Sequence, residues 1–225
     1  MQFPDTQILI FARPPLPGQA KTRLSPLLGE AGTAAFHAAC VEHAVQRFHA
    51  AGLAPLQLCA ADQSDHPLFV RLSHQYQMPV LEQQGADLGE RMARAARQAL
   101  ETAHSVILIG TDSPTLPPRT LRLAIEQLQQ GAEVTMAPAE DGGYVLLGLR
   151  EAHPALFSDM PWGSEQVAQI TRARCREAGL RLEALPSCAD IDHPHDLLAV
   201  LPEGQRGEVL AGLDAPAWLA LLRSL

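Results

Sequence analysis

Three cations follow an apolar run near the start of the sequence, in a loop rich in proline. The run spans residues 8–12, and Arg13, Lys21 and Arg23 come after it. Backbone N–H groups of a stiff loop can form a concave nest for a phosphate, with lysine as a point charge and arginine as a two-pronged donor. The spacing is not that of a Walker loop, because no glycine directly precedes Lys21. The loop therefore indicates an anion site, and a solvated basic loop is the alternative.

Aspartates follow two other apolar runs, where metal-ligating carboxylates would be useful. Asp112 comes just after the run at 106–109, and Asp190 and Asp192 follow the run at 180–185. Magnesium takes one or two carboxylates in addition to the phosphate oxygens of a substrate, so Asp112 and one of the pair would suffice. The alternatives are ordinary caps: a turn cap for Asp112 and helix capping for the pair.

Two further loops could border a ligand. Asp141 precedes the Gly-Gly-Tyr sequence at 142–144. Paired glycines permit a positive φ and a close approach of the backbone to a ligand, although a hairpin-like turn would use the same residues. Asp87 and Ser164 are expected to be helix N-caps, and Trp162 is expected in the core or in the wall of a cavity.

The order of the apolar runs predicts an α/β fold. Short apolar runs predict strands at 8–12, 56–60, 80–81, 106–109, 134–137, 144–149 and 180–185. Longer amphipathic runs predict helices at 31–50, 88–102, 116–130, 164–178 and 195–201, and a terminal helix within 204–225. The alternation implies right-handed crossovers and a mostly parallel central sheet with helices on both faces. Ligands bind such sheets beyond the carboxyl ends of the strands, which is where the polar residues above stand.

Composition excludes several classes of protein. The chain has 225 residues, 47% hydrophobic and 19% charged, with a formal net charge of −8. This charge disfavours binding to nucleic acid polymers, which requires a basic surface. Four cysteines lie far apart, so we expect buried thiols in a reducing cytosol and no zinc site. Without a signal peptide or an apolar run of about 20 residues, a cytoplasmic protein with no membrane span is expected.

Five motifs, in order, resemble the DUF2064 family of small bacterial proteins, described as a domain of unknown function. They are Phe-Ala-Arg-Pro-Pro-Leu-Pro-Gly-Gln-Ala-Lys-Thr-Arg-Leu at 11–24, a Gly-x-Leu-Gly-x-Arg-Met pattern with one extra residue at 85–92, Gly-Thr-Asp-Ser-Pro-Thr-Leu at 110–116, Asp-Gly-Gly-Tyr at 141–144 and Asp-Ile-Asp at 190–192. The resemblance covers about residues 7–200. One departure is Trp-Gly-Ser at 162–164, where the family more typically has Trp-Ser-Thr. Members of the family are usually labelled glycosyltransferases or nucleotide-diphospho-sugar transferases.

The resemblance implies a GT-A-like fold, that of the nucleotide-diphospho-sugar transferases, in a single domain over residues 1–225 with its core at about 7–200 and a helical tail at 204–225. It also implies a nucleotide or nucleotide-sugar substrate and a divalent metal, Mg²⁺ or Mn²⁺, held by Asp112 and Asp192. The expected nucleotide-binding residues are Ala12, Arg13, Pro17, Gly18, Lys21, Arg23, Gly89, Arg91 and Thr111. Catalysis is expected to involve Asp112, Lys21 and Asp141, and the acceptor would face Gly142, Gly143, Tyr144 and Trp162.

The leading functional hypothesis is a metal-dependent glycosyltransferase that uses a nucleotide-diphospho-sugar donor. Lys21 and Arg23 would neutralise the leaving phosphate, and Asp141 would be the base on the acceptor side. A nucleotidyltransferase that releases pyrophosphate stays open, because the basic loop suits a triphosphate equally well. A nucleotide-binding module without catalysis is the third hypothesis. The oligomeric state is left open, with a homodimer as one option.

Overall fold

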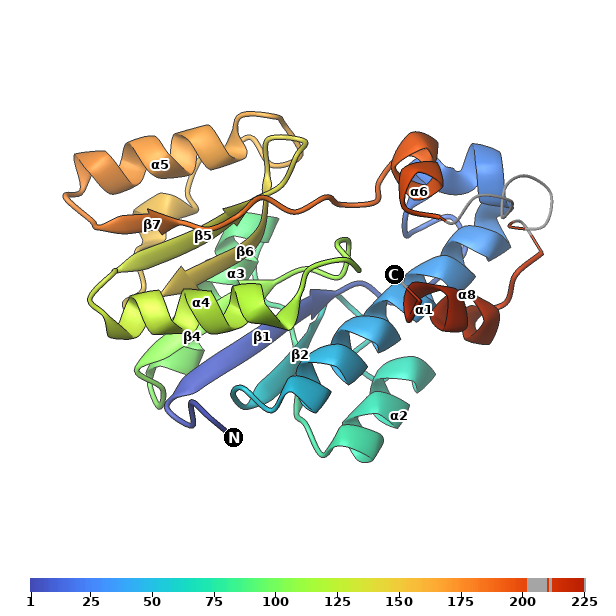
Figure 1. The fold of residues 1–225 in the computed structure, drawn as a ribbon, viewed down its shortest axis with the longest axis horizontal. Helices are drawn as coiled ribbons and strands as arrows, with labels where there is room; N and C mark the ends of the chain where they lie inside the picture. Colours follow the sequence, from blue (N-terminus) through green and yellow to red (C-terminus); the bar gives the residue numbers. More distant parts are fainter. Residues whose placement is uncertain (202–209, 211, 225) are drawn as a thin grey trace.

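A seven-stranded sheet forms the centre of the molecule in the computed structural model, which describes residues 1–201, 210 and 212–224 (Figure 1). The strands are β1 (Thr6–Ala12), β2 (Leu56–Ala60), β3 (Val80–Glu82), β4 (Ser105–Ile109), β5 (Val134–Pro138), β6 (Tyr144–Leu149) and β7 (Leu182–Ala184). Their order is β3-β2-β1-β4-β6-β5-β7, and all neighbours are parallel except the two pairs that include β6. The predicted fold class, a mostly parallel α/β sheet, is confirmed.

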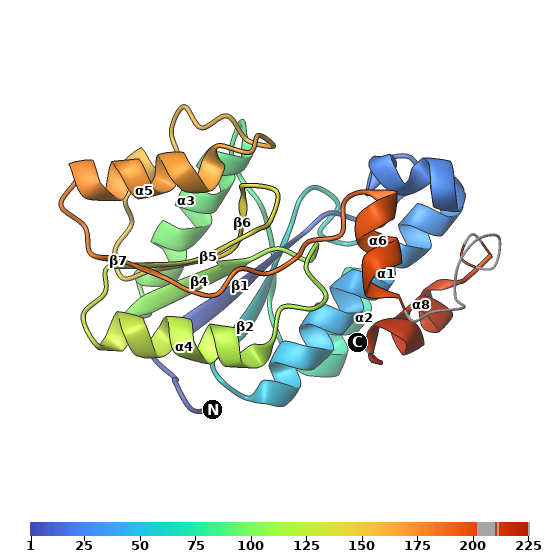
Figure 2. The same cartoon turned by 45° about the horizontal axis from the view of Figure 1, so that its top comes forward.

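Helices cover both faces of this sheet (Figure 2). They are α1 (Ser25–Ala51), α2 (Pro67–Tyr76), α3 (Leu88–Leu100), α4 (Pro118–Gln129), α5 (Val167–Glu177), α6 (Pro194–Val200) and α8 (Ala215–Leu222), with short 3₁₀ turns η1 (Thr22–Leu24) and η2 (Pro154–Leu156). Buried residues of α1, α2 and α4 pack on one face, and those of α3 and α5 pack on the other. No helix among the described residues combines the length and the apolar character needed to cross a bilayer.

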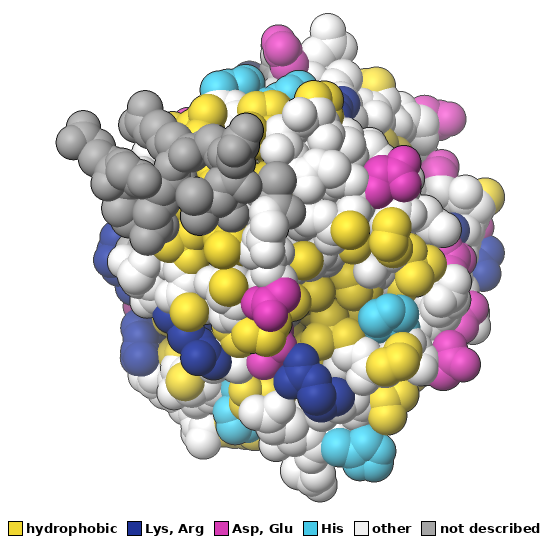
Figure 3. Space-filling model, turned by 90° about the vertical axis from the view of Figure 1, so that its right-hand side faces the viewer, with side chains coloured by type: hydrophobic (Ala, Val, Ile, Leu, Met, Phe, Trp, Pro, Cys, Tyr) yellow, Lys and Arg dark blue, Asp and Glu magenta, His cyan; other side chains and the backbone are white. Residues whose placement is uncertain are grey.

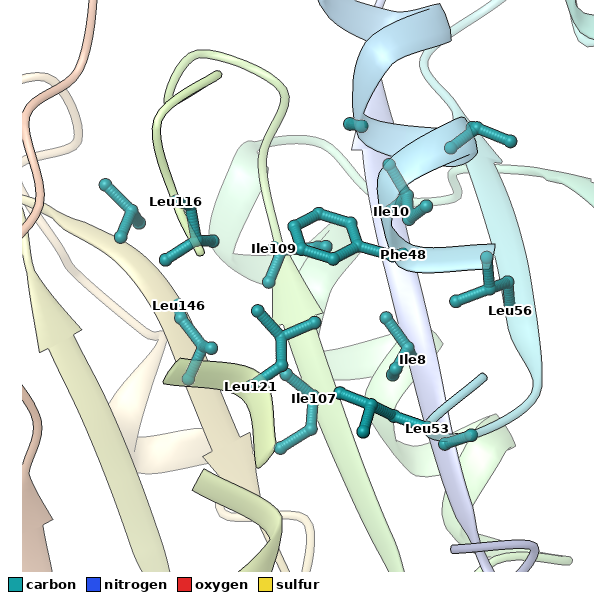
Figure 4. Packing of buried hydrophobic residues seen from close by; sticks show 14 of the residues in the cluster. Ile8, Ile10, Phe48, Leu53, Leu56, Ile107, Ile109, Leu116, Leu121 and Leu146 are labelled. Atoms are coloured by element: carbon teal, nitrogen blue, oxygen red, sulfur yellow. The ribbon is translucent and has the colours of Figure 1, made fainter. Parts of the chain in front are cut away.

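The core follows the two-residue period of the central strands. Ile8 and Ile10 of β1 point toward α1 and α4, whereas Leu9 points toward the opposite layer. Ile107 and Ile109 of β4 lie beside them in the same layer (Figure 4). All five are buried, and each such side chain stabilises the fold by about 1.5–3 kcal/mol. Burial on both faces explains why the sequence shows continuous apolar runs here.

A separate cluster joins the start of α1 to the last part of the chain. Phe36 of α1 contacts Trp218 of α8 edge to face, with ring centroids 4.9 Å apart, and both side chains are fully buried. Figure 1 shows α8 and α6 beside α1, away from the centre of the sheet. Of the predicted terminal helix, residues 204–209, 211 and 225 lie outside the described residues. On this side of the molecule, Lys and Arg side chains are interspersed with Asp and Glu, with apolar side chains between them (Figure 3).

Helix boundaries differ from the predictions at three places. Helix α2 was not predicted, although it begins with Pro67 and the Nδ1 atom of His66 accepts a hydrogen bond from Leu68 N (3.2 Å). Helix α1 begins earlier than predicted and is interrupted at Gly29, where φ is 68°. Ser164 is not an N-cap, because α5 begins at Val167 and the hydroxyl of Ser164 accepts only from Gln166 N in the preceding turn (3.4 Å). The Asp87 cap is confirmed, since its carboxylate accepts from Glu90 N (2.8 Å).

Candidate functional site

One edge of the sheet surrounds a cavity of about 690 Å³. The residues after the carboxyl ends of β1 to β5 line it, together with the start of β6, which reaches the same edge because it runs antiparallel. All of the predicted site residues are on the wall of this cavity except Pro17, Gly18, Gly89 and Gly142. The structure therefore brings together segments that lie far apart in the sequence.

The four exceptions lie off the cavity wall. Pro17 and Gly18 are exposed at the tip of the basic loop. Gly89 lets Trp162 pack against α3, since a Cβ atom there would lie 2.8 Å from the indole Nε1 and 2.4 Å from the carbonyl oxygen of Phe157. Gly142 does the same for the following segment, because its Cβ would lie 2.1 Å from the carbonyl oxygen of Glu165. Contact of these four residues with a ligand stays a prediction.

Lys21 joins two aspartates at the bottom of the cavity. Its Nζ atom forms an ion pair with Asp112 Oδ1 at 2.6 Å, and it donates hydrogen bonds to Asp192 Oδ1 (3.0 Å) and to the carbonyl of Ile191 (2.6 Å). The side chain of Lys21 is only 2% exposed, whereas those of Asp112 and Asp192 are 53% and 37% exposed. The ammonium group thus lies beneath the two carboxylates, which face the cavity.

The local backbone explains this convergence. Lys21 adopts a left-handed conformation, with φ 53°, immediately before η1, and such strained non-glycine residues persist where the surroundings hold them. The segment after β7 returns to the central strands, and Ile191 N donates to the carbonyl of Asp112 (2.9 Å). Burial acts to lower the pKa of Lys21, but the charges of Asp112 and Asp192 outweigh it and hold this pKa above its ordinary value. The ammonium therefore stays charged.

The two arginines of the basic loop are more open. Arg23 is 57% exposed, and its Nη1 lies 3.7 Å from Asp192 Oδ2. Arg13 is exposed at the end of β1, and its carbonyl accepts a hydrogen bond from Nε2 of His37 (3.1 Å). The exposed ion pair with Asp192 at 3.7 Å holds Arg23 only weakly. Both guanidinium groups are therefore available to an anion in the cavity.

His37 is a buried residue of the cavity wall that sequence reasoning missed. Its Nε2 position must donate to the Arg13 carbonyl, so Nδ1 is unprotonated in the neutral ring, and Nδ1 has no partner among the described residues. Burial lowers the pKa of His37. A single histidine within a helix gives no sequence signal. Asp62 and Gln83 also line the cavity and were not predicted. Asp62 follows β2 and Gln83 follows β3, so a search for polar residues after the carboxyl ends of strands could have found them.

An aromatic wall closes the other side. The rings of Tyr144 and Trp162 meet at 85° with centroids 6.3 Å apart, and the Tyr144 hydroxyl lies 4.0 Å from Met92 Sδ. Arg91 is on the same side, held by a hydrogen bond from its Nε to the carbonyl of Gly85 (3.1 Å). Asp141 Oδ1 accepts from Gly143 N (2.9 Å), which is the ordinary turn contact considered for this loop.

Helix capping does not explain the pair formed by Asp190 and Asp192. The cap of α6 is formed by His193 and Asp196, whose carboxylate accepts from His193 N (2.7 Å). Asp192 instead binds Lys21. The pKa of Asp190 is raised to about 6, because the group is partly buried and lies near the negative charges of Asp141 and Asp192.

The donor set is compatible with a divalent metal that is shared with a substrate. No cluster of three or more His, Cys, Asp or Glu side chains suited to a metal occurs in the described part of the chain. Mg²⁺, however, is commonly bound through one or two carboxylates and substrate phosphates. Asp112 and Asp192 each contact Lys21 through Oδ1, and their side chains are 53% and 37% exposed. These residues fit a metal that arrives with phosphate ligands.

Comparisons with known proteins agree with this fold. A structure from Desulfovibrio desulfuricans, described as a "putative nucleotide-diphospho-sugar transferase", is 31% identical, with 99% of this chain and 95% of that chain covered and a TM-score of 0.83. 4-Diphosphocytidyl-2C-methyl-D-erythritol synthase is 15% identical (88% and 97% covered, TM-score 0.58). Glucosyl-3-phosphoglycerate synthase from Mycobacterium tuberculosis, in complex with Mn²⁺ and uridine diphosphate, is 11% identical (87% and 75% covered, TM-score 0.53). At these lower identities, the last two show a shared fold alone.

The family assignment rests on sequence as well. None of the curated proteins compared with the chain matches it. The prediction of a transferase is confirmed at the level of enzyme class by the Desulfovibrio relative. Residues 44–164 match the family described as "uncharacterized protein conserved in bacteria (DUF2064)". The chain belongs to this family.

Proposed function

We propose that this protein is a metal-dependent glycosyltransferase that uses a nucleotide-diphospho-sugar donor. The observation that supports it most is the meeting of Asp112 and Asp192 at a cavity edged by two accessible arginines. The description of the Desulfovibrio relative supports the same donor class. A bound Mg²⁺ or Mn²⁺ would supply Lewis-acid stabilisation of the diphosphate.

The residues of the chain would divide the remaining tasks. Arg13 and Arg23 would bind phosphate oxygens and stabilise the charge that develops as the bond from the sugar carbon to the diphosphate breaks. Asp141 would use its free oxygen to accept the proton of the acceptor hydroxyl, whose oxygen forms the new bond to that carbon. The wall of Tyr144 and Trp162 would exclude water on the acceptor side. Loss of one well-placed cation would raise the barrier by on the order of 3 kcal/mol, or about a hundredfold in rate.

The test is a panel of nucleotide-diphospho-sugars with Mn²⁺ or Mg²⁺, in which release of nucleoside diphosphate is measured. Asp112→Asn is expected to lose at least a hundredfold in turnover. Asp65→Asn makes the same chemical change at an exposed position off the cavity wall, and this variant is expected to keep the turnover of the unaltered protein. Release of pyrophosphate from nucleoside triphosphates, with no reaction of any sugar donor, would replace this proposal with nucleotidyl transfer. Binding without turnover of either substrate class would contradict both.

A further inference from the structure

The ammonium group of Lys21 is surrounded by oxygen atoms of the protein. It donates hydrogen bonds to the Ile191 carbonyl and to Asp192 Oδ1. Its third close neighbour is Asp112 Oδ1, with which it forms an ion pair at 2.6 Å. With its side chain 2% exposed, the group cannot contact a phosphate in the cavity without leaving these partners.

The charges around the two aspartates determine how strongly they would attract a metal ion. The two carboxylates contribute two negative charges, and Lys21 cancels one of them from beneath. Arg23 offsets part of the other at 3.7 Å from Asp192. A divalent ion held by these two aspartates would therefore be attracted by about one net negative charge, and would be repelled by the ammonium that contacts the same carboxylates.

We propose that Lys21 is a positioning residue that acts as the resident cation of the Asp112–Asp192 pair, so that a divalent metal binds well only together with the phosphates of the nucleotide. The inference rests on the proposed function for the metal and the nucleotide. Phosphates restore the attraction in two ways: they add negative charge on the cavity side, and they supply the oxygen ligands that the two aspartates lack. Direct contact with the phosphates then falls to Arg13 and Arg23.

The direct test is to titrate the protein with Mn²⁺ in the absence of nucleotide. Electron paramagnetic resonance measures the concentration of free Mn²⁺, and hence the affinity. Lys21→Met removes the ammonium, and we expect it to bind Mn²⁺ at least tenfold more tightly than the unaltered protein. Lys21→Arg keeps the charge and is expected to stay within threefold of the unaltered protein. Arg94→Met is the matched control, because it removes a cation that is 50% exposed and lies 2.7 Å from the carboxylate of Glu90, off the cavity wall. It is also expected to stay within threefold.

The second measurement is the coupling between metal and nucleotide. Saturating ADP, GDP, CDP or UDP is each tested for its effect on the Mn²⁺ affinity. The effective nucleotide should raise this affinity at least tenfold in the unaltered protein and less than threefold in Lys21→Met. Far-UV circular dichroism checks folding, and Lys21→Gln, whose amide can still donate to a carboxylate, replaces the Met variant if that variant is unfolded.

The outcomes separate the two proposals. If the Lys21→Met or Lys21→Gln variant binds Mn²⁺ as weakly as the unaltered protein, the resident-cation role is overturned, whatever nucleotides do. If no nucleotide changes the Mn²⁺ affinity of the unaltered protein while the variant still gains tenfold, the role of Lys21 stands and the proposed nucleotide-dependent function fails.

Discussion

Gly142 is the position where a single methyl group should damage the site most. Its φ is +91°, and a Cβ atom would lie 2.1 Å from the carbonyl oxygen of Glu165. The strained backbone costs about 1–3 kcal/mol, and overpacking typically costs about 1–3 kcal/mol more. If the turn moves away instead, the hydrogen bond from Ala168 N to the Gly142 carbonyl is lost. For Gly142→Ala we expect the free energy of unfolding to fall by about 2–5 kcal/mol, a large part of the 5–15 kcal/mol usual for a domain.

The neighbouring glycine provides the control. Gly143 does not have a positive φ, and the nearest atom to its Cβ would be Asp141 Oδ1 at 3.1 Å. Gly143→Ala should therefore cost less than about 1 kcal/mol, because a flexible carboxylate can move by a few tenths of an ångström. Urea denaturation followed by circular dichroism measures both variants. A Gly142→Ala protein within 0.5 kcal/mol of Gly143→Ala, roughly the scatter of surface substitutions, would refute the reasoning from close backbone approach.

Three further predictions concern buried groups. Trp218→Ala should cost about 3–5 kcal/mol of unfolding free energy, because it empties a fully buried site against Phe36, whereas Trp218→Phe should cost clearly less; equal losses in urea denaturation would contradict this. Gly89→Ala should displace Trp162 and change its fluorescence, since a Cβ would lie 2.8 Å from the indole nitrogen, and an unchanged spectrum would argue against this packing. Burial lowers the pKa of His37 and His43 below 6.5 in the folded protein. As the pH falls, the unfolded chain therefore takes up protons at these histidines before the folded protein does. The free energy of unfolding should then fall as the pH drops below about 6.5. His43→Gln should flatten that slope between pH 7.5 and 5.5, and a slope unchanged by the substitution would exclude this cause.

Much of the fold was predictable because its central strands, such as β4, are buried on both faces. All seven strands were expected from apolar runs, and the central ones, such as 106–109, agree closely with β4. Helix α2 escaped prediction, although two of its residues, Phe69 and Leu72, are buried at the three-residue spacing of one helix face. Its start signal, His66 followed by Pro67, was nevertheless present.

The site was predictable to the level of which segments meet. Polar residues after strands converge at one edge by topology, which is why Asp112 could be paired in advance with Asp190 or Asp192. The choice of Asp192 came from the resemblance to the family. What the side chains do there depends on tertiary contacts. The burial of Lys21 beneath both carboxylates and the supporting roles of Gly89 and Gly142 come from neighbours distant in the sequence, and no local pattern encodes them.

The path of the chain after β7 has a consequence for synthesis. Asp192 reaches Lys21 only when the segment that follows β7 has crossed back to β4, held by the hydrogen bond from Ile191 to Asp112. A nascent chain emerging from the ribosome can form the first strands and helices much earlier, since folding tends to proceed from the N-terminal part. Until translation has passed the final aspartates, Lys21 has only one of its two carboxylate partners. We therefore expect incomplete translation products to be inert toward the substrate, so that the protein engages it only once nearly the whole chain has been made.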